Sequence, residues 1–94
     1  PERFYTVITA AVSVAPLFDQ TAVKVPLTIS AGQAQLGDFI AMIPPYDLEA
    51  NLAPWGAYLS SSVTIQLCLH SIDSVAPATK NWKFVVIPDA ITDL

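Results

Sequence analysis

The second half of the chain is a series of short apolar runs separated by turns, and its clearest pattern lies at Val63–Leu69. In this segment (VTIQLCL) every second residue is aliphatic and the residues between are polar or small. A period of two over seven residues is typical of a β-strand with one buried face. A second apolar run, Trp82–Ile87 (WKFVVI), follows after a loop. We predict that these two strands pair antiparallel and offer their apolar face to the rest of the chain.

Four further strands are predicted upstream from the same kind of pattern. They are Phe4–Val14, Ala22–Ile29, Phe39–Ile43 and Trp55–Leu59. The first is apolar on both faces, as expected of a strand between layers or at a subunit contact. Pro26 cannot donate a ladder hydrogen bond, so the second strand is predicted to lie at a sheet edge or to carry a bulge. Only Tyr46–Leu52 has helical spacing, enough for a turn or two before Pro54.

The order of these elements predicts an all-β fold. Strands separated by turns every 8–12 residues or so, with no strong helix, are typical of a sandwich or a barrel. The 94 residues are enough for one domain, which we place at 1–94. Short arms at 1–3 and 89–94 would flank it, and we expect them to be loose or to hold a neighbouring molecule.

The composition predicts that this domain does not act alone. Hydrophobic residues make up 53% of the chain and charged residues only 13%, whereas soluble domains have roughly 45–50% and 25%. A chain this short buries only about 60–65% of its unfolded surface, so it cannot hide so much apolar surface inside itself. We therefore expect copies of the chain, or a partner, to cover the surplus.

Aromatic and aliphatic side chains near the chain start and in the later strands are the candidates for these contacts. We expect oligomer or partner contacts at Phe4, Tyr5, Val7, Trp55, Tyr58 and Trp82. The three last-named aromatics could instead form a platform on which a sugar stacks. Trp82, however, alternates in phase with Phe84 and Val86, which favours a place in the core or at a subunit contact.

The charge of the chain excludes several partners. The net charge is −4, and the four basic residues form no cluster of the kind that neutralises phosphates, so we expect no nucleic-acid partner. The longest apolar run is far too short for a membrane span. The apolar residues 6–18 lack a preceding basic region and a cleavage pattern, and the lone Cys68 excludes an internal disulfide. We expect synthesis in a cytoplasm and no membrane partner.

The residues offer little for a metal site. Cys68 and His70 stand two apart on a predicted strand and would share one face. A zinc site needs three or four convergent ligands, and this is the only histidine of the chain. No spaced Asp-x-Asp run predicts a calcium loop. We therefore expect no bound metal and no cofactor.

The sequence evidence for catalytic residues is equally weak. His70 could act as a base with a nearby serine such as Ser71 and with Asp73 as its orienter, but no Gly-x-Ser-x-Gly elbow is present. Asp47 and Glu49 could form a carboxylate pair, yet a domain of this size has little room for a cleft between them. Acidic side chains beside turns more often cap backbone amides. We expect no catalytic residue and no enzymatic activity.

Residues 37–87 resemble a known family in their spacing and hydrophobic pattern. The matching features are Gly37-Asp38, an apolar strand with a Pro-Pro stop, the strand VTIQL, a His-Ser-Ile-Asp turn, an Ala-Pro loop and the closing WKFVVI. The pattern resembles small β-sandwich virion proteins of tailed bacteriophages, which are capsid decoration (cement) proteins and knobs of head or tail fibres. His70 stands where we would expect an asparagine in the related turn, a departure that concerns no chemistry.

The resemblance implies a small antiparallel, jelly-roll-like β-sandwich of about six strands that assembles as a homotrimer on the virion. It also implies a function: a non-enzymatic capsid decoration protein that bridges subunits of the major capsid protein and stabilises the head. The alternative is a trimeric fibre knob that binds a host receptor or glycan. The chain shows no stem sequence, which favours the first. We expect the protein on the outer surface of the capsid, after synthesis in the host cytoplasm.

Overall fold

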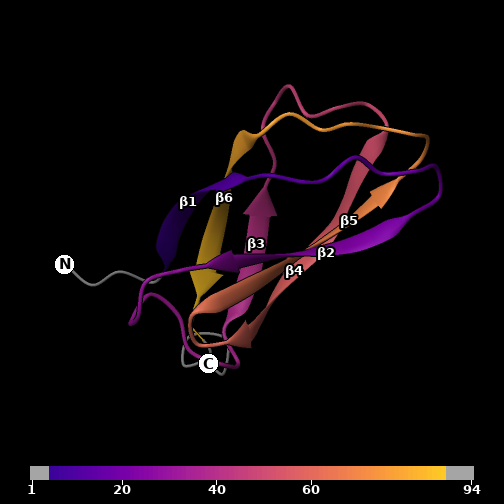
Figure 1. Ribbon diagram of the computed structural model, residues 1–94. Coiled ribbons are helices and arrows are strands. Elements are labelled where there is room, and N and C mark those ends of the chain that lie inside the picture. The colour runs from indigo at the N-terminus through magenta and orange to yellow at the C-terminus, as the bar shows by residue number, and fades with distance from the viewer. Residues whose placement is uncertain (1–4, 89–94) are drawn as a thin grey trace.

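The computed structural model describes residues 5–88, which form six strands in two three-stranded antiparallel sheets (Figure 1). The strands are β1 (Thr6–Val12), β2 (Ala22–Thr28), β3 (Phe39–Ile43), β4 (Leu52–Ser61), β5 (Thr64–Ser71) and β6 (Lys80–Ile87). One sheet has the order β1–β6–β3 and the other the order β2–β5–β4. Residues 5–88 contain no helix, so the predicted all-β sandwich is confirmed. The arms predicted at 1–3 and 89–94 lie outside the described residues.

The strands are nested in the manner of a jelly roll. β1 pairs with β6 in one sheet, and β2 pairs with β5 in the other. The chain therefore crosses between the sheets after β1, β2, β3 and β5, and we call the segments after β1 and after β5 the two crossing segments. The two crossing segments run side by side (Figure 1), and Leu17 and Val75 exchange backbone hydrogen bonds of 2.8 and 3.0 Å between them. This arrangement is the jelly-roll-like sandwich that the resemblance implied.

The predicted pairing of the strand at 63–69 with the strand at 82–87 is wrong. β5 lies between β2 and β4, and β6 lies between β1 and β3, so the two strands belong to opposite sheets. The segment between them, residues 72–79, carries the chain across the core and does not reverse it in a tight turn. A short connection does make a hairpin of β4 and β5, which pair antiparallel.

The core lies between the inward faces of the two central strands. The side chains of Ile65, Leu67 and Leu69 on β5 face those of Trp82, Phe84 and Val86 on β6, and each is at most 2% exposed. This corrects one predicted contact residue. Trp82 is in phase with the core positions of β6 and is buried inside the subunit, so it cannot contact a partner.

Both edges of the β2–β5–β4 sheet contain a proline. Pro26 lies in the edge strand β2, as predicted. Pro54 does not end a helical turn but lies inside β4, which begins at Leu52 and is also an edge strand. An edge strand tolerates proline because one row of its backbone groups pairs with no neighbour. The segment Tyr46–Leu52 contains only turns before that strand begins.

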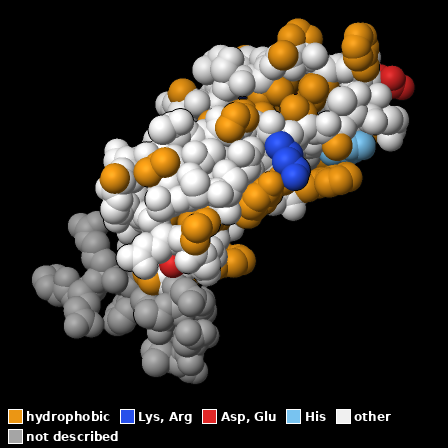
Figure 2. Space-filling view, turned by 60° about the horizontal axis from the view of Figure 1, so that its bottom comes forward, with side chains coloured by type: hydrophobic (Ala, Val, Ile, Leu, Met, Phe, Trp, Pro, Cys, Tyr) orange, Lys and Arg blue, Asp and Glu red, His pale blue; other side chains and the backbone are white. Residues whose placement is uncertain are grey.

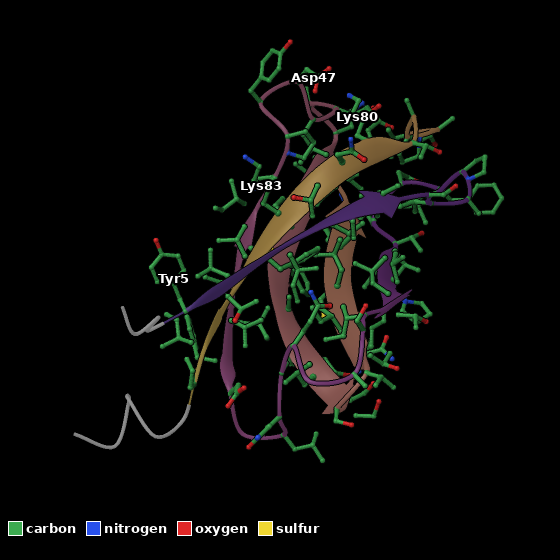
Figure 3. All side chains as sticks on the ribbon, turned by 90° about the vertical axis from the view of Figure 1, so that its left-hand side faces the viewer. Tyr5, Asp47, Lys80 and Lys83 are labelled. Carbon is green, nitrogen blue, oxygen red and sulfur yellow. The ribbon has the colours of Figure 1, made fainter. Side chains whose placement is uncertain are left out.

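An acidic side chain ties two loops together at one end of the sandwich. Glu49 Oε2 accepts a 3.0 Å hydrogen bond from the backbone N–H of Ala78 and lies 3.3 Å from Lys80 Nζ. Lys80 also donates to the backbone carbonyl of Asp47, and Figure 3 shows these two side by side. The Ala78 N–H, with help from Lys80, lowers the pKa of Glu49 below its ordinary value.

We predict that Glu49→Gln lowers the free energy of unfolding by about 1 kcal/mol at pH 7, because a charged acceptor is replaced by a neutral one. The lowered pKa adds a pH dependence. The carboxylate contributes stability above the unfolded pKa of about 4.3, and this contribution is lost as the pH falls through the folded value. Urea unfolding at pH 7 and at pH 3 should show the difference from wild type shrinking at the lower pH. An equal difference in stability between wild type and Glu49→Gln at both pH values would contradict this role of the Glu49 carboxylate.

Candidate functional site

Most of the outer side of the β1–β6–β3 sheet is apolar, and we call its apolar residues the apolar face. In an antiparallel sheet, residues opposite one another share a face. The register places Val85 between Val7 and Ala41, and places Ile87 opposite Phe39. The apolar face comprises Tyr5, Val7, Phe39, Ala41, Ile43, Val85 and Ile87.

Much of the apolar face is open to solvent. Phe39 is 57% exposed, Tyr5 56% and Val7 49%. Lys83 is the one charged residue that the register places on this side of the described strands, and Figure 3 shows it and Tyr5 projecting away from the other sheet. The outer side of a sheet that faces water is usually polar. An apolar one is typical of a surface that a partner covers.

The outer side of the β2–β5–β4 sheet has a different character, and we call it the aromatic face. The register of β4 shifts between Pro54 and Gly56, which makes Trp55 a bulge residue. A bulge redirects a side chain, and here the indole is 66% exposed. It stacks on the His70 ring, with 4.8 Å between ring centroids and 15° between ring planes. The stack holds the exposed indole in one orientation.

A second aromatic pair lies on the same face. Lys24 Nζ lies 5.4 Å from the centre of the Tyr58 ring. Hydrogen bonding to Tyr58 is the main cause that raises the pKa of Lys24 above its ordinary value. A shallow pocket of about 230 Å³ lies against the two pairs, lined by Ala22, Val23, Lys24, Trp55, Cys68 and Leu69. Figure 2 shows a basic side chain and the histidine beside hydrophobic side chains.

A third apolar area lies where the two crossing segments meet. A pocket of about 380 Å³ is lined there by Pro16, Leu17, Phe18, Ser74, Val75 and Ala76. The Phe18 side chain beside it is 81% exposed. The backbone bonds between Leu17 and Val75 fix the two walls relative to each other. This end therefore offers a preformed apolar depression.

The structure divides the predicted contact residues among separate places. Tyr5 and Val7 lie on the apolar face, whereas Trp55 and Tyr58 lie on the aromatic face of the opposite sheet. Phe4 lies outside the described residues, and Trp82 is in the core. Sequence reasoning missed the rest of the apolar face, which includes Phe39, Ile43 and Val85. The signal was the unbroken apolar run at Phe39–Ile43, which is apolar on both sides of its strand.

The residues considered as catalytic candidates lie on β5 and in the loops. His70 and Ser71 are neighbours in a strand and point to opposite sides, so they form no nucleophile–base pair. Ser71 is fully buried, and its Oγ accepts a 2.9 Å hydrogen bond from the Thr21 N–H. Cys68 and His70 do share the outer side of β5, as predicted. No three His, Cys, Asp or Glu side chains within residues 5–88 come close enough to hold a metal ion.

Comparison with protein-family models, with curated proteins and with solved structures finds no match. In the part of the chain that the structure describes, no helix is long and apolar enough to cross a membrane.

Proposed function

We propose that the protein is a non-enzymatic structural protein that decorates the outside of a bacteriophage capsid as a homotrimer. In this role it bridges neighbouring subunits of the major capsid protein and stabilises the head. The observation that carries the proposal is the apolar face, a sheet surface with half-exposed aromatic and aliphatic side chains and, among the described strands, a single charge beside them. A small domain with such a surface is expected to bury it against copies of itself.

The place in a virion rests on the resemblance of residues 37–87 to phage decoration proteins. The fold is compatible with it, because jelly rolls occur in viral capsid proteins, although they occur in lectins as well. The net charge of −4 suits a position away from packaged DNA.

Trimerisation would make a weak contact effective. One copy has room for only a small footprint on a shell, for example at the depression beside Phe18. Three joined copies engage three equivalent shell sites together, and the effective concentration of the second and third contacts raises the overall affinity by orders of magnitude. The apolar face then serves self-association, and the end with the crossing segments serves the shell.

The test uses particles that lack the protein. We expect them to assemble but to release DNA at a lower temperature or under milder osmotic shock, and addition of purified protein should restore robustness. The variant Phe18→Asp, changed only at the proposed shell contact, should stay folded and restore little. Particles that are equally robust with and without the protein would contradict the decoration role.

The alternative function, a fibre knob that binds a host receptor or glycan, is favoured by the aromatic face. A stacked and exposed indole beside a small pocket suits a sugar ring. If this function holds, Trp55→Ala should reduce adsorption of particles to cells about tenfold or more, since exposed tryptophans in binding sites often contribute that much. The control is Val63→Ala, at an exposed turn position. Unchanged adsorption with the Trp55 variant would contradict the knob.

A further inference from the structure

The two sheets together have four edge strands, and three of them carry features that prevent pairing with another chain. β2 contains Pro26, and β4 contains Pro54 with two shifts of register. β3 is only five residues long and is followed by two prolines. Prolines, bulges and shortness are the usual means by which proteins protect a sheet edge.

β1 is the exception. Its seven residues (TVITAAV) include no proline and no charge, and they pair with β6 through seven consecutive partners without a shift. Within residues 5–88, its backbone pairs with β6 alone and makes no other backbone hydrogen bond. The outer edge of β1 therefore presents a regular row of N–H and C=O groups. Such a row is a template for one kind of partner, an extended strand.

We propose that β1 pairs antiparallel with β1 of a second copy across a two-fold axis. The sequence of the strand is suited to this. With Thr9 opposite Thr9 of the partner, Ile8 faces Ala10 and Val7 faces Ala11. In each pair, both side chains lie on the same face of the sheet. The core-facing residues of the two copies therefore stay on one face of the joined sheet. The chain has a net charge of −4, but β1 carries none of it, so two copies meet here without like-charge repulsion.

The pairing joins two sheets into one of six strands, in the order β3–β6–β1–β1–β6–β3. The apolar faces of the two copies then form one continuous surface. The contact uses the backbone edge of β1 and not the side chains of the apolar face, so it can form with or without the proposed three-fold association. A subunit with a three-fold contact on its face and a two-fold contact on its edge can link trimers into a net. This goes beyond the decoration role, because it joins decorating trimers to one another.

The first test is a charge at the centre of the pairing. Thr9 is exposed and lies opposite Lys83 of its own subunit, so Thr9→Glu should fold normally, while two glutamates directly opposite each other destabilise the pairing between copies. The matched control is Thr28→Glu, the same change at an exposed position of the proline-protected strand β2. In sedimentation we expect Thr9→Glu to have a lower mass than wild type and the control: a trimer if the apolar faces associate, and a monomer if they do not. An unchanged mass with an intact circular dichroism spectrum would overturn the proposal.

The second test is a cross-link. In a Cys68→Ser background, Thr9→Cys places two thiols opposite each other, with Cβ atoms about 4.5–5.5 Å apart, close to the range of a disulfide. Mild oxidation should yield a covalent dimer at least about tenfold faster than it does for Thr28→Cys, because pairing raises the effective concentration of the thiols. Equal rates would overturn the proposal. Neither test needs a capsid, so the pairing and the decoration role can fail separately.

Discussion

Replacing Phe39 by glutamate is expected to abolish association through the apolar face without unfolding the subunit. Phe39 is 57% exposed at the end of the edge strand β3, so the subunit loses little when its ring is removed. In an association that buries the apolar face, the new carboxylate would be desolvated without a partner, which costs about 3–5 kcal/mol. That is a weakening of at least about a hundredfold.

The measurement is sedimentation at micromolar concentration. Wild type should have a mass that is a multiple of three subunits, and the Phe39 variant should fall to two copies joined at β1, or to one when combined with Thr9→Glu. The control is Tyr58→Glu, which puts the same charge on an exposed aromatic of the opposite sheet. If the control dissociates and the Phe39 variant does not, the interface lies on the aromatic face.

Replacing Ser71 by alanine is expected to cause the largest loss of stability among single changes of a polar side chain. Ser71 is fully buried at the end of β5. Its Oγ accepts from the Thr21 N–H and donates to the Phe18 carbonyl, so one hydroxyl fixes the turn that enters β2. Alanine would leave both groups without a partner, which costs about 1–3 kcal/mol.

The loss should appear as a lower urea midpoint with an unchanged slope, measured at one protein concentration because assembly also shifts the midpoint. Ser62→Ala, at an exposed turn, is the control and should stay within about 0.5 kcal/mol of wild type. A Ser71 variant as stable as the control would show that the hydroxyl does not hold this turn.

The strands could be predicted from the sequence because each is an apolar run bounded by turn residues, and the strands at 22–29 and 63–69 also alternate with a period of two. Their partners could not. A period of two says which side of a strand is buried, but β5 and β6 are buried by facing each other across the core, not by pairing. Residues 72–79 join them, and a connection of this length is compatible with a return in the same sheet or with a crossing to the other.

The candidate surfaces were predicted in part, for a similar reason. The excess of apolar residues predicted exposed contacts, and Tyr5, Val7, Trp55 and Tyr58 are indeed exposed. The sequence could not separate them into two faces, because that depends on which strands are neighbours. The bulge at Trp55 is likewise set by the register of β4 against β5.

The most direct test of the account is a reconstruction of an intact particle that contains the protein, at a resolution that shows the two sheets. We expect sandwiches of about 44 × 23 × 21 Å in groups of three on the outer surface of the capsid. The apolar faces should turn toward the three-fold axis, and the ends with the crossing segments should touch the shell. Single sandwiches with the apolar face open to solvent, or sandwiches found only at the tips of fibres, would contradict it.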